Sequence, residues 1–84
     1  MGFYMFTFRS VTPSQRAERI LKNSGYSCRL GRTPRWMEEQ GCGYSLKIFD
    51  GEPTDVAMLL KNNGVAYRKI YLQKESGNME ELKL

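Results

Sequence analysis

The sequence predicts a small α+β domain, and two observations support this fold class. Strand-like and helix-like stretches follow one another in two halves of similar size, each with the order strand, helix, strand. The segments at 21–25 and 60–64 differ at one position, and each ends a predicted helix before a predicted strand. These features are typical of the ferredoxin-like βαββαβ plan, in which two helices cover one face of a four-stranded antiparallel sheet.

The first strand and the first helix have clear local signals. Residues 3–8 are aromatic or apolar on both alternating faces, which is typical of a central strand. Thr12, Pro13 and Gln15 have the spacing of a capping box with proline at the first helical position, so Thr12 is expected to be the N-cap. The helix is therefore predicted over 13–24.

Alternating polarity and terminal glycine or proline residues define the remaining elements. Strands are expected at 26–31, 44–48 and 65–72, and a second helix is expected between Pro53 and Gly64. In the first of these strands Cys28 lies on the apolar face and is expected to be a small core residue. Residues 74–84 are polar without a clear period and are expected to be a flexible tail, which leaves one domain over 1–73.

The composition excludes several kinds of chemistry. The chain has no histidine, so hydrolytic triads and dyads built on a histidine base are excluded. Its two cysteines lack CxxC spacing, and no metal site or cofactor is expected. No apolar run approaches the ~20 residues of a membrane span, and the first residues lack the basic region of a signal peptide. We therefore expect a cytoplasmic protein with reduced thiols and no disulfide between Cys28 and Cys42.

The net charge of +4 is distributed unevenly along the chain. Residues 1–49 contain eight basic and three acidic side chains. This imbalance suits an acidic partner protein, an anionic small molecule or a nucleic acid, and it also occurs on ordinary solvated surfaces.

The long segment between the second and third predicted strands is the candidate functional loop, because loops of this length in a small domain are usually functional or disordered. It ends in a thiol between two glycines, at Cys42. In the predicted sheet the start of the third strand lies beside the end of the first. Cys42 and Gly43 are therefore expected near Arg9, Ser10 and Thr12, at the start of the first helix. A helix N-terminus and a guanidinium both lower a cysteine pKa from its reference of ~8.5, so Cys42 is predicted to be reactive in sulfur exchange.

The same loop has alternative interpretations. Arg32, Arg35 and Trp36 are candidates for recognising an anion or a partner protein, since arginine and tryptophan are favoured in interfaces. Trp36 and Met37 can equally pack the loop onto the sheet. Cys42 can likewise be a packed thiol at a tight entry into the third strand.

Several segments together resemble the putative selenium/sulfur carrier protein-like family, a group of small bacterial proteins. The segments that carry this resemblance are 4–8, 17–22, Gly25, Pro34 and 42–46. The likeness covers residues 3–72. It implies that Cys42, followed by Gly43, holds sulfur or selenium as a persulfide or selenopersulfide during transfer between proteins. With no histidine in the chain, proton transfer would rely on solvent or on Ser10.

Three functions compete at this point. The first is a sulfur or selenium carrier with a protein donor, such as a cysteine desulfurase, and a protein acceptor; it is a carrier or binding module rather than a stand-alone enzyme. The second is a ligand-sensing or oligomerisation module without thiol chemistry, with a homodimer through the open sheet face. The third is RNA binding by bases stacked on Tyr4, Phe6 and Phe8. It is the least favoured, because the third predicted strand lacks the glycine and aromatic pattern of an RNA-recognition motif.

Overall fold

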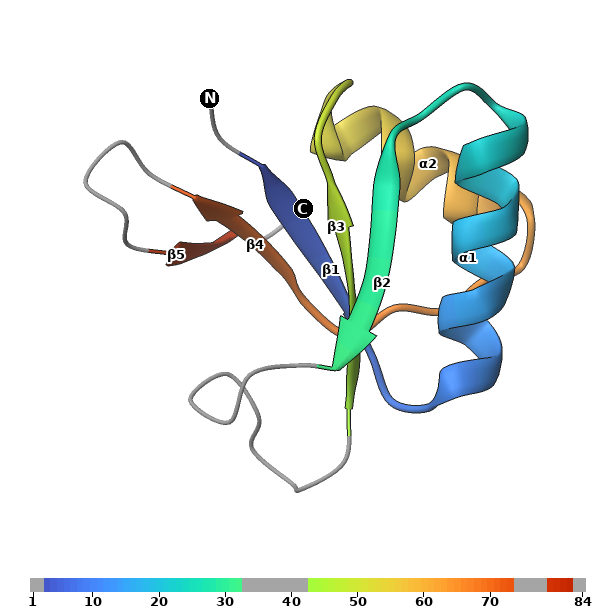
Figure 1. The fold of residues 1–84 in the computed structure, drawn as a ribbon, viewed down its shortest axis with the longest axis horizontal. Coiled ribbons are helices and arrows are strands. Elements are labelled where there is room, and N and C mark those ends of the chain that lie inside the picture. The colour runs from blue at the N-terminus through green and yellow to red at the C-terminus, as the bar shows by residue number, and fades with distance from the viewer. Residues whose placement is uncertain (1–2, 33–42, 74–78, 83–84) are drawn as a thin grey trace.

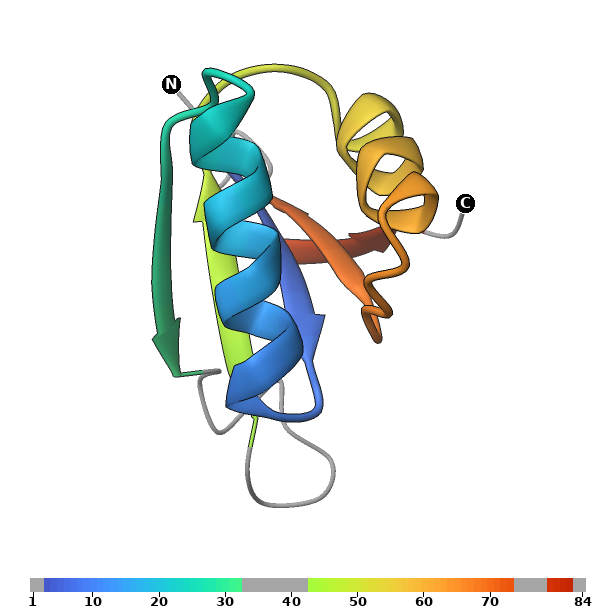
Figure 2. The ribbon, with the colours of Figure 1, turned by 90° about the vertical axis from the view of Figure 1, so that its right-hand side faces the viewer.

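One antiparallel sheet and two helices make up the part of the chain that the structure, a computed structural model, describes: residues 3–32, 43–73 and 79–82. The elements are β1 (Tyr4–Phe8), α1 (Val11–Asn23), β2 (Cys28–Arg32), β3 (Tyr44–Ile48), α2 (Pro53–Asn62), β4 (Ile70–Gln73) and β5 (Met79–Leu82). Both helices lie on the same side of the sheet (Figures 1 and 2). Neither described helix is long and apolar enough to cross a membrane.

The sheet has five strands in the order β2-β3-β1-β4-β5, where the sequence analysis expects four. As expected, β1 and β3 are adjacent, antiparallel and central. The arrangement is therefore compatible with a ferredoxin-like plan, with one strand added. The extra strand, β5, lies in the stretch expected to be a tail and pairs with β4 through Tyr71↔Glu81 and Gln73↔Met79. β5 pairs with β4 through its backbone, and this pairing does not require alternating apolar side chains. The sequence therefore gives no clear strand pattern for β5.

The aromatic residues of β1 point into the core between the sheet and the helices. Tyr4, Phe6 and Phe8 are 6%, 0% and 1% exposed, and they belong to the same buried cluster as Leu21 of α1 and Leu60 of α2. Their rings are therefore not available for stacking nucleic-acid bases. The structure thus contradicts the basis of the RNA-binding hypothesis.

The start of α1 differs from the prediction. Ser10, not Thr12, is the N-cap residue, and no side-chain hydrogen bond caps the helix. Pro13 consequently lies in the first turn rather than at its first position, where its missing N–H still costs nothing because these N–H groups have no intrahelical acceptor. The buried face of α1 begins at Ser14, whose hydroxyl donates to the carbonyl of Val11 at 2.6 Å. The helix therefore begins two residues before its predicted start.

Both helices end in the same hydrogen-bonded motif, which explains the repeated segment of the sequence. After α1, the N–H of Tyr26 donates to the carbonyl of Leu21 at 2.9 Å, and Gly25 has φ +89°. After α2, the N–H of Val65 donates to the carbonyl of Leu60 at 2.9 Å, around Gly64 with φ +71°. These are the bonds of a Schellman C-cap, in which glycine adopts the left-handed conformation.

Two strands are displaced from their predicted bounds. β2 begins at Cys28 and continues to Arg32, beyond the expected end. The predicted strand at 65–72 is regular only in β4, although the N–H of Arg68 donates to the carbonyl of Thr7 at 2.7 Å. An extended connection that packs beneath a helix can also have alternating apolar residues. The alternation at 65–72 therefore predicted a longer strand than the one observed, β4.

A glycine-to-alanine comparison tests the C-cap assignment. Gly64→Ala should lower the free energy of unfolding by about 1 kcal/mol, because an L-residue is strained at positive φ. No atom lies within 4 Å of a Cβ built at Gly64, so the loss would come from backbone conformation and not from a clash. Gly31→Ala is the matched control, since its added Cβ also meets nothing within 4 Å and its φ is not positive. Urea unfolding monitored by circular dichroism measures both; equal effects would contradict the assignment.

Candidate functional site

Four segments of the chain meet at one end of the sheet. Phe8, the last residue of β1, pairs with Tyr44, the first residue of β3, and Tyr44 also pairs with Arg32, the last residue of β2. Gly43 is buried immediately before β3, and Arg9 follows β1 in the exposed connection to α1. The sheet register therefore brings the ends of β1 and β2, the start of β3 and the start of α1 together, as the sequence analysis expects (Figure 1).

The electrostatic character of this end is positive. The first turn of α1 contains no acidic residue, and the N-cap Ser10 makes no side-chain cap hydrogen bond. The N–H groups of this turn thus keep the partial positive charge of a helix N-terminus. Arg9 is exposed beside it, and Thr12 is exposed in the same turn. The guanidinium carbon of Arg32 lies 5.8 Å from the centre of the Tyr44 ring, a cation–π contact that holds this charge at the end of β2.

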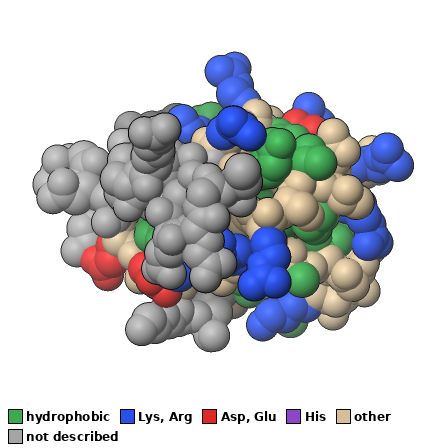
Figure 3. All heavy atoms as spheres, turned by 90° about the horizontal axis from the view of Figure 1, so that it is seen from below, with side chains coloured by type: hydrophobic (Ala, Val, Ile, Leu, Met, Phe, Trp, Pro, Cys, Tyr) green, Lys and Arg blue, Asp and Glu red, His purple; other side chains and the backbone are tan. Residues whose placement is uncertain are grey.

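Sequence reasoning missed two further cations at this end. Arg68 and Lys69 precede β4, and their backbones bond to Thr7 of β1. The Nζ of Lys69 lies 3.9 Å from the Oε1 of Glu81, which compensates part of its charge. If the antiparallel pairing of β4 with β1 had been predicted, it would have placed Arg68 near the end of β1 and therefore near Arg9. Figure 3 shows Lys and Arg side chains exposed on this end of the molecule.

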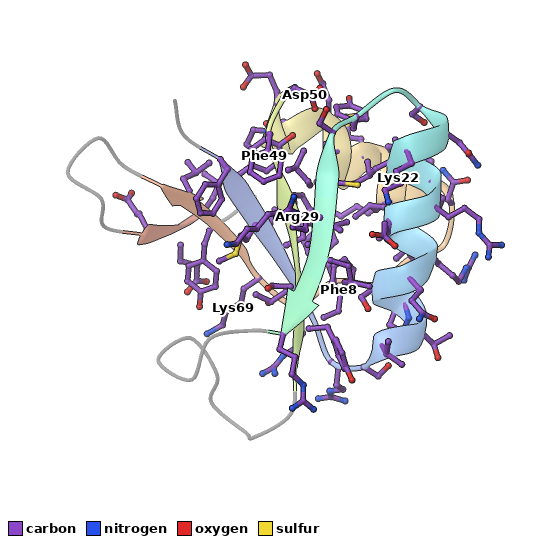
Figure 4. The ribbon with its side chains drawn as sticks, viewed as in Figure 1. Phe8, Lys22, Arg29, Phe49, Asp50 and Lys69 are labelled. Atoms are coloured by element: carbon purple, nitrogen blue, oxygen red, sulfur yellow. The ribbon has the colours of Figure 1, made fainter. Side chains whose placement is uncertain are left out.

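Carboxylates gather at the opposite end of the sheet. Asp50 and Glu52 follow β3, and Asp55 lies in the first turn of α2. Figure 4 shows Asp50 and Lys69 at opposite ends of the molecule. The described part of the chain is therefore polarised, with cations at the end that contains Gly43 and the start of α1. This end can stabilise an anion, and a thiolate is one such anion.

The predicted site residues fall into two groups. Those that the structure places at this end are Arg9, Ser10, Thr12, Arg32 and Gly43. Those that lie outside the described residues are Arg35, Trp36 and Cys42. The chemical roles assigned to both groups stay predictions.

Cys28 lies at the other end of β3, where it pairs with Ile48. It is half-buried against the core, and its Sγ lies 3.9 Å from the carbonyl oxygen of Glu18 in α1. Burial raises the pKa of the Cys28 thiol, the nearby Lys22 opposes this rise, and Glu18 adds to it. The thiol is therefore held in its protonated, unreactive form, in agreement with the expected packing role.

A comparison with known families identifies the group to which the chain belongs. A family profile described as "Putative Se/S carrier protein-like" matches residues 3–72, most of the chain. The protein therefore belongs to this family, which confirms the resemblance found in the sequence. No curated protein and no solved structure matches the chain.

The reactivity of Cys28 follows from its environment. In a Cys42→Ser variant, alkylation of Cys28 by iodoacetamide should have a higher pH midpoint in the folded protein than in the unfolded chain, because burial raises the pKa of this thiol. A raised folded-state pKa also means that Cys28 supports folding below its unfolded pKa, and that this contribution is lost as pH rises through the folded pKa. Intact mass spectrometry across a pH series gives the midpoint. The same variant in urea is the control, and equal folded and unfolded midpoints would contradict this assignment.

Proposed function

We propose that this protein carries sulfur or selenium on Cys42, as a persulfide or selenopersulfide, between partner proteins of the cytoplasm. Membership of the carrier-like family is the observation that carries the proposal. The cationic end of the sheet supports it independently, because a carrier thiol needs a positive environment to be ionised near neutral pH.

The covalent chain links Cys42 to that end. Cys42 immediately precedes Gly43 in the chain, and Gly43 directly precedes β3. Because Tyr44 pairs with Phe8, the register predicts that Gly43 lies beside Arg9, Ser10 and the start of α1. We assign Arg9 and the N-terminus of α1 the role of lowering the pKa of Cys42.

The transfer itself is a thiol exchange without net oxidation. The Cys42 thiolate attacks the outer sulfur of a persulfide on the donor protein, and the donor's S–S bond breaks as its cysteine leaves as a thiolate. Cys42 then holds the outer sulfur as its own persulfide. A thiolate of the acceptor attacks that sulfur next, and Cys42 leaves as a thiolate. A cysteine desulfurase is the class of donor that supplies such a persulfide.

The remaining predicted residues complete the proposal. Ser10 is the N-cap residue of α1. We assign its hydroxyl, together with solvent, the transfer of protons to and from the thiol of Cys42. Arg32, Arg35 and Trp36 are proposed to contact the partner proteins, with Thr12 on the exposed first turn of α1. The frame for these residues is a ferredoxin-like βαββαβ core with β5 added at one edge of the sheet. The alternative module without thiol chemistry requires that Cys42→Ser have no functional effect.

Persulfide loading tests the proposal. Incubation with a cysteine desulfurase, pyridoxal phosphate and cysteine should add the mass of one sulfur atom to the protein, removable by dithiothreitol, as read by intact mass spectrometry. Cys28→Ser should retain this gain, because Cys28 is held as a thiol against the core. Cys42→Ser should lose it. Loading that survives Cys42→Ser and disappears with Cys28→Ser would overturn the assignment.

The pKa of Cys42 provides a second test. In the Cys28→Ser background, the alkylation midpoint of Cys42 should lie below ~8.5. Arg9→Gln should raise this midpoint by a few tenths of a pH unit, since an exposed guanidinium acts through solvent. Arg19→Gln is the matched control, because Arg19 is an exposed arginine of α1 beyond the first turn of the helix. Equal shifts in the two variants would show that only net charge matters.

A further inference from the structure

The strand β2 is one edge of the sheet. It pairs with β3 on one side, and no strand among the described residues pairs with its other side. Figure 1 shows β2 at the margin of the sheet, next to α1. An edge strand presents backbone N–H and C=O groups to solvent, and an extended segment of another protein can pair with them as an additional strand.

A groove of about 150 Å³ lies over β2 and β3, beside this edge. Its lining residues come from β2 and β3, and they are Arg29, Leu30, Gly31, Arg32, Ser45 and Lys47. Gly31 leaves the groove open near the end of β2, where an added Cβ would meet no atom within 4 Å. A side chain of an added strand therefore has room on this part of the sheet face.

Two like charges face one another in this groove. Arg29 and Lys47 are directly opposite in the register of β2 and β3. Both belong to the face away from α1, because the neighbouring Cys28 and Leu30 pack against the core and side chains alternate along a strand; Figure 4 shows Arg29. Like charges in this arrangement destabilise a sheet. Among the residues that the structure describes, no carboxylate pairs with either cation. The Nζ of Lys47 lies 5.1 Å from the centre of the Phe3 ring.

We propose that an extended, acidic segment of a partner protein adds to β2 as a new edge strand, with its carboxylates on the outer face of the sheet, against Arg29 and Lys47. Backbone pairing would supply affinity, and the two cations would select acidic side chains at alternate positions of the added strand. A second copy of this chain is a poorer occupant of the same edge. Its own β2 carries Arg29 and Arg32 and no acidic residue, so self-pairing would bring like charges together. The proposal does not depend on the thiol chemistry of Cys42.

A labelled peptide tests this surface. The probe is a fluorescein-labelled octapeptide of alternating glutamate and valine, and its binding to the full chain is measured by fluorescence anisotropy at low and at physiological salt. Two control peptides separate the contributions. One has lysine in place of glutamate, and the other keeps the glutamates but carries N-methyl groups on alternate backbone nitrogens, which prevents strand pairing.

Charge-reversal variants locate the binding site. Arg29→Glu and Lys47→Glu should each weaken binding about fivefold or more, since each replaces an attraction by a repulsion. Arg19→Glu is the matched control, because it makes the same charge change on an exposed part of α1, and it should alter affinity less than about twofold. In ¹⁵N-correlated NMR spectra, the amide signals of Cys28 and Leu30 should move on binding, because their N–H groups face away from β3.

Each contrary outcome overturns the proposal in a distinct way. No binding of the acidic peptide would exclude the surface for this ligand class. An equal loss of affinity with Arg19→Glu would show that the peptide responds to the net charge of the protein and not to this site. Equal affinity for the N-methylated peptide would exclude strand addition, and tighter binding of single-stranded oligouridylate would assign the groove to nucleic acid instead. Persulfide loading, measured separately, distinguishes failure here from failure of the carrier function.

Discussion

The antiparallel pairing of β1 with β3 is the constraint on which the rest of the structure depends. Its register sets Phe6 opposite Leu46, and both side chains are fully buried. A shift of one residue would turn Phe6 and Phe8 to the outer face of the sheet and expose two of the largest core side chains. Burial of roughly 1.5–3 kcal/mol per such side chain therefore fixes the register. The same register brings Gly43 beside the connection from β1 to α1.

The charge distribution gives the two ends of this sheet different chemical properties. Arg9, Arg32 and the uncapped N-terminus of α1 lie at one end, and Asp50 and Glu52 lie at the other. A cysteine acquires a different pKa at each end, because nearby charge and burial act on the thiolate and not on the thiol. Cys28 is held near the acidic end, half-buried. The residue after Cys42 belongs to the basic end, and this contrast is the physical basis for assigning carrier chemistry to one thiol and a structural role to the other.

Local signals in the sequence were sufficient where a single segment decides the outcome. The glycines that end both helices were recognised because the left-handed conformation of a C-cap is a property of one residue. The bounds of β3 and the start of α2 followed from alternation and from Pro53 in the same way. The N-cap of α1 was misplaced because Ser10 and Thr12 are both favoured N-cap residues and local sequence alone does not choose between them. β5 was missed because strand pairing depends on a partner, here β4, and not on its own side chains.

The α+β class, the family, and the order of the helices and central strands were all predictable from the sequence alone, and so was the Gly-Cys-Gly segment at 41–43. These properties depend on residue types and on spacings within one segment, which the chain states directly. Only the tertiary structure decided that Arg68 joins the cationic end, that the aromatic rings of β1 are buried, and that Arg29 and Lys47 face one another across β2 and β3. Each of these depends on the register between distant strands, and that register results from the packing of the whole core, which no single segment encodes.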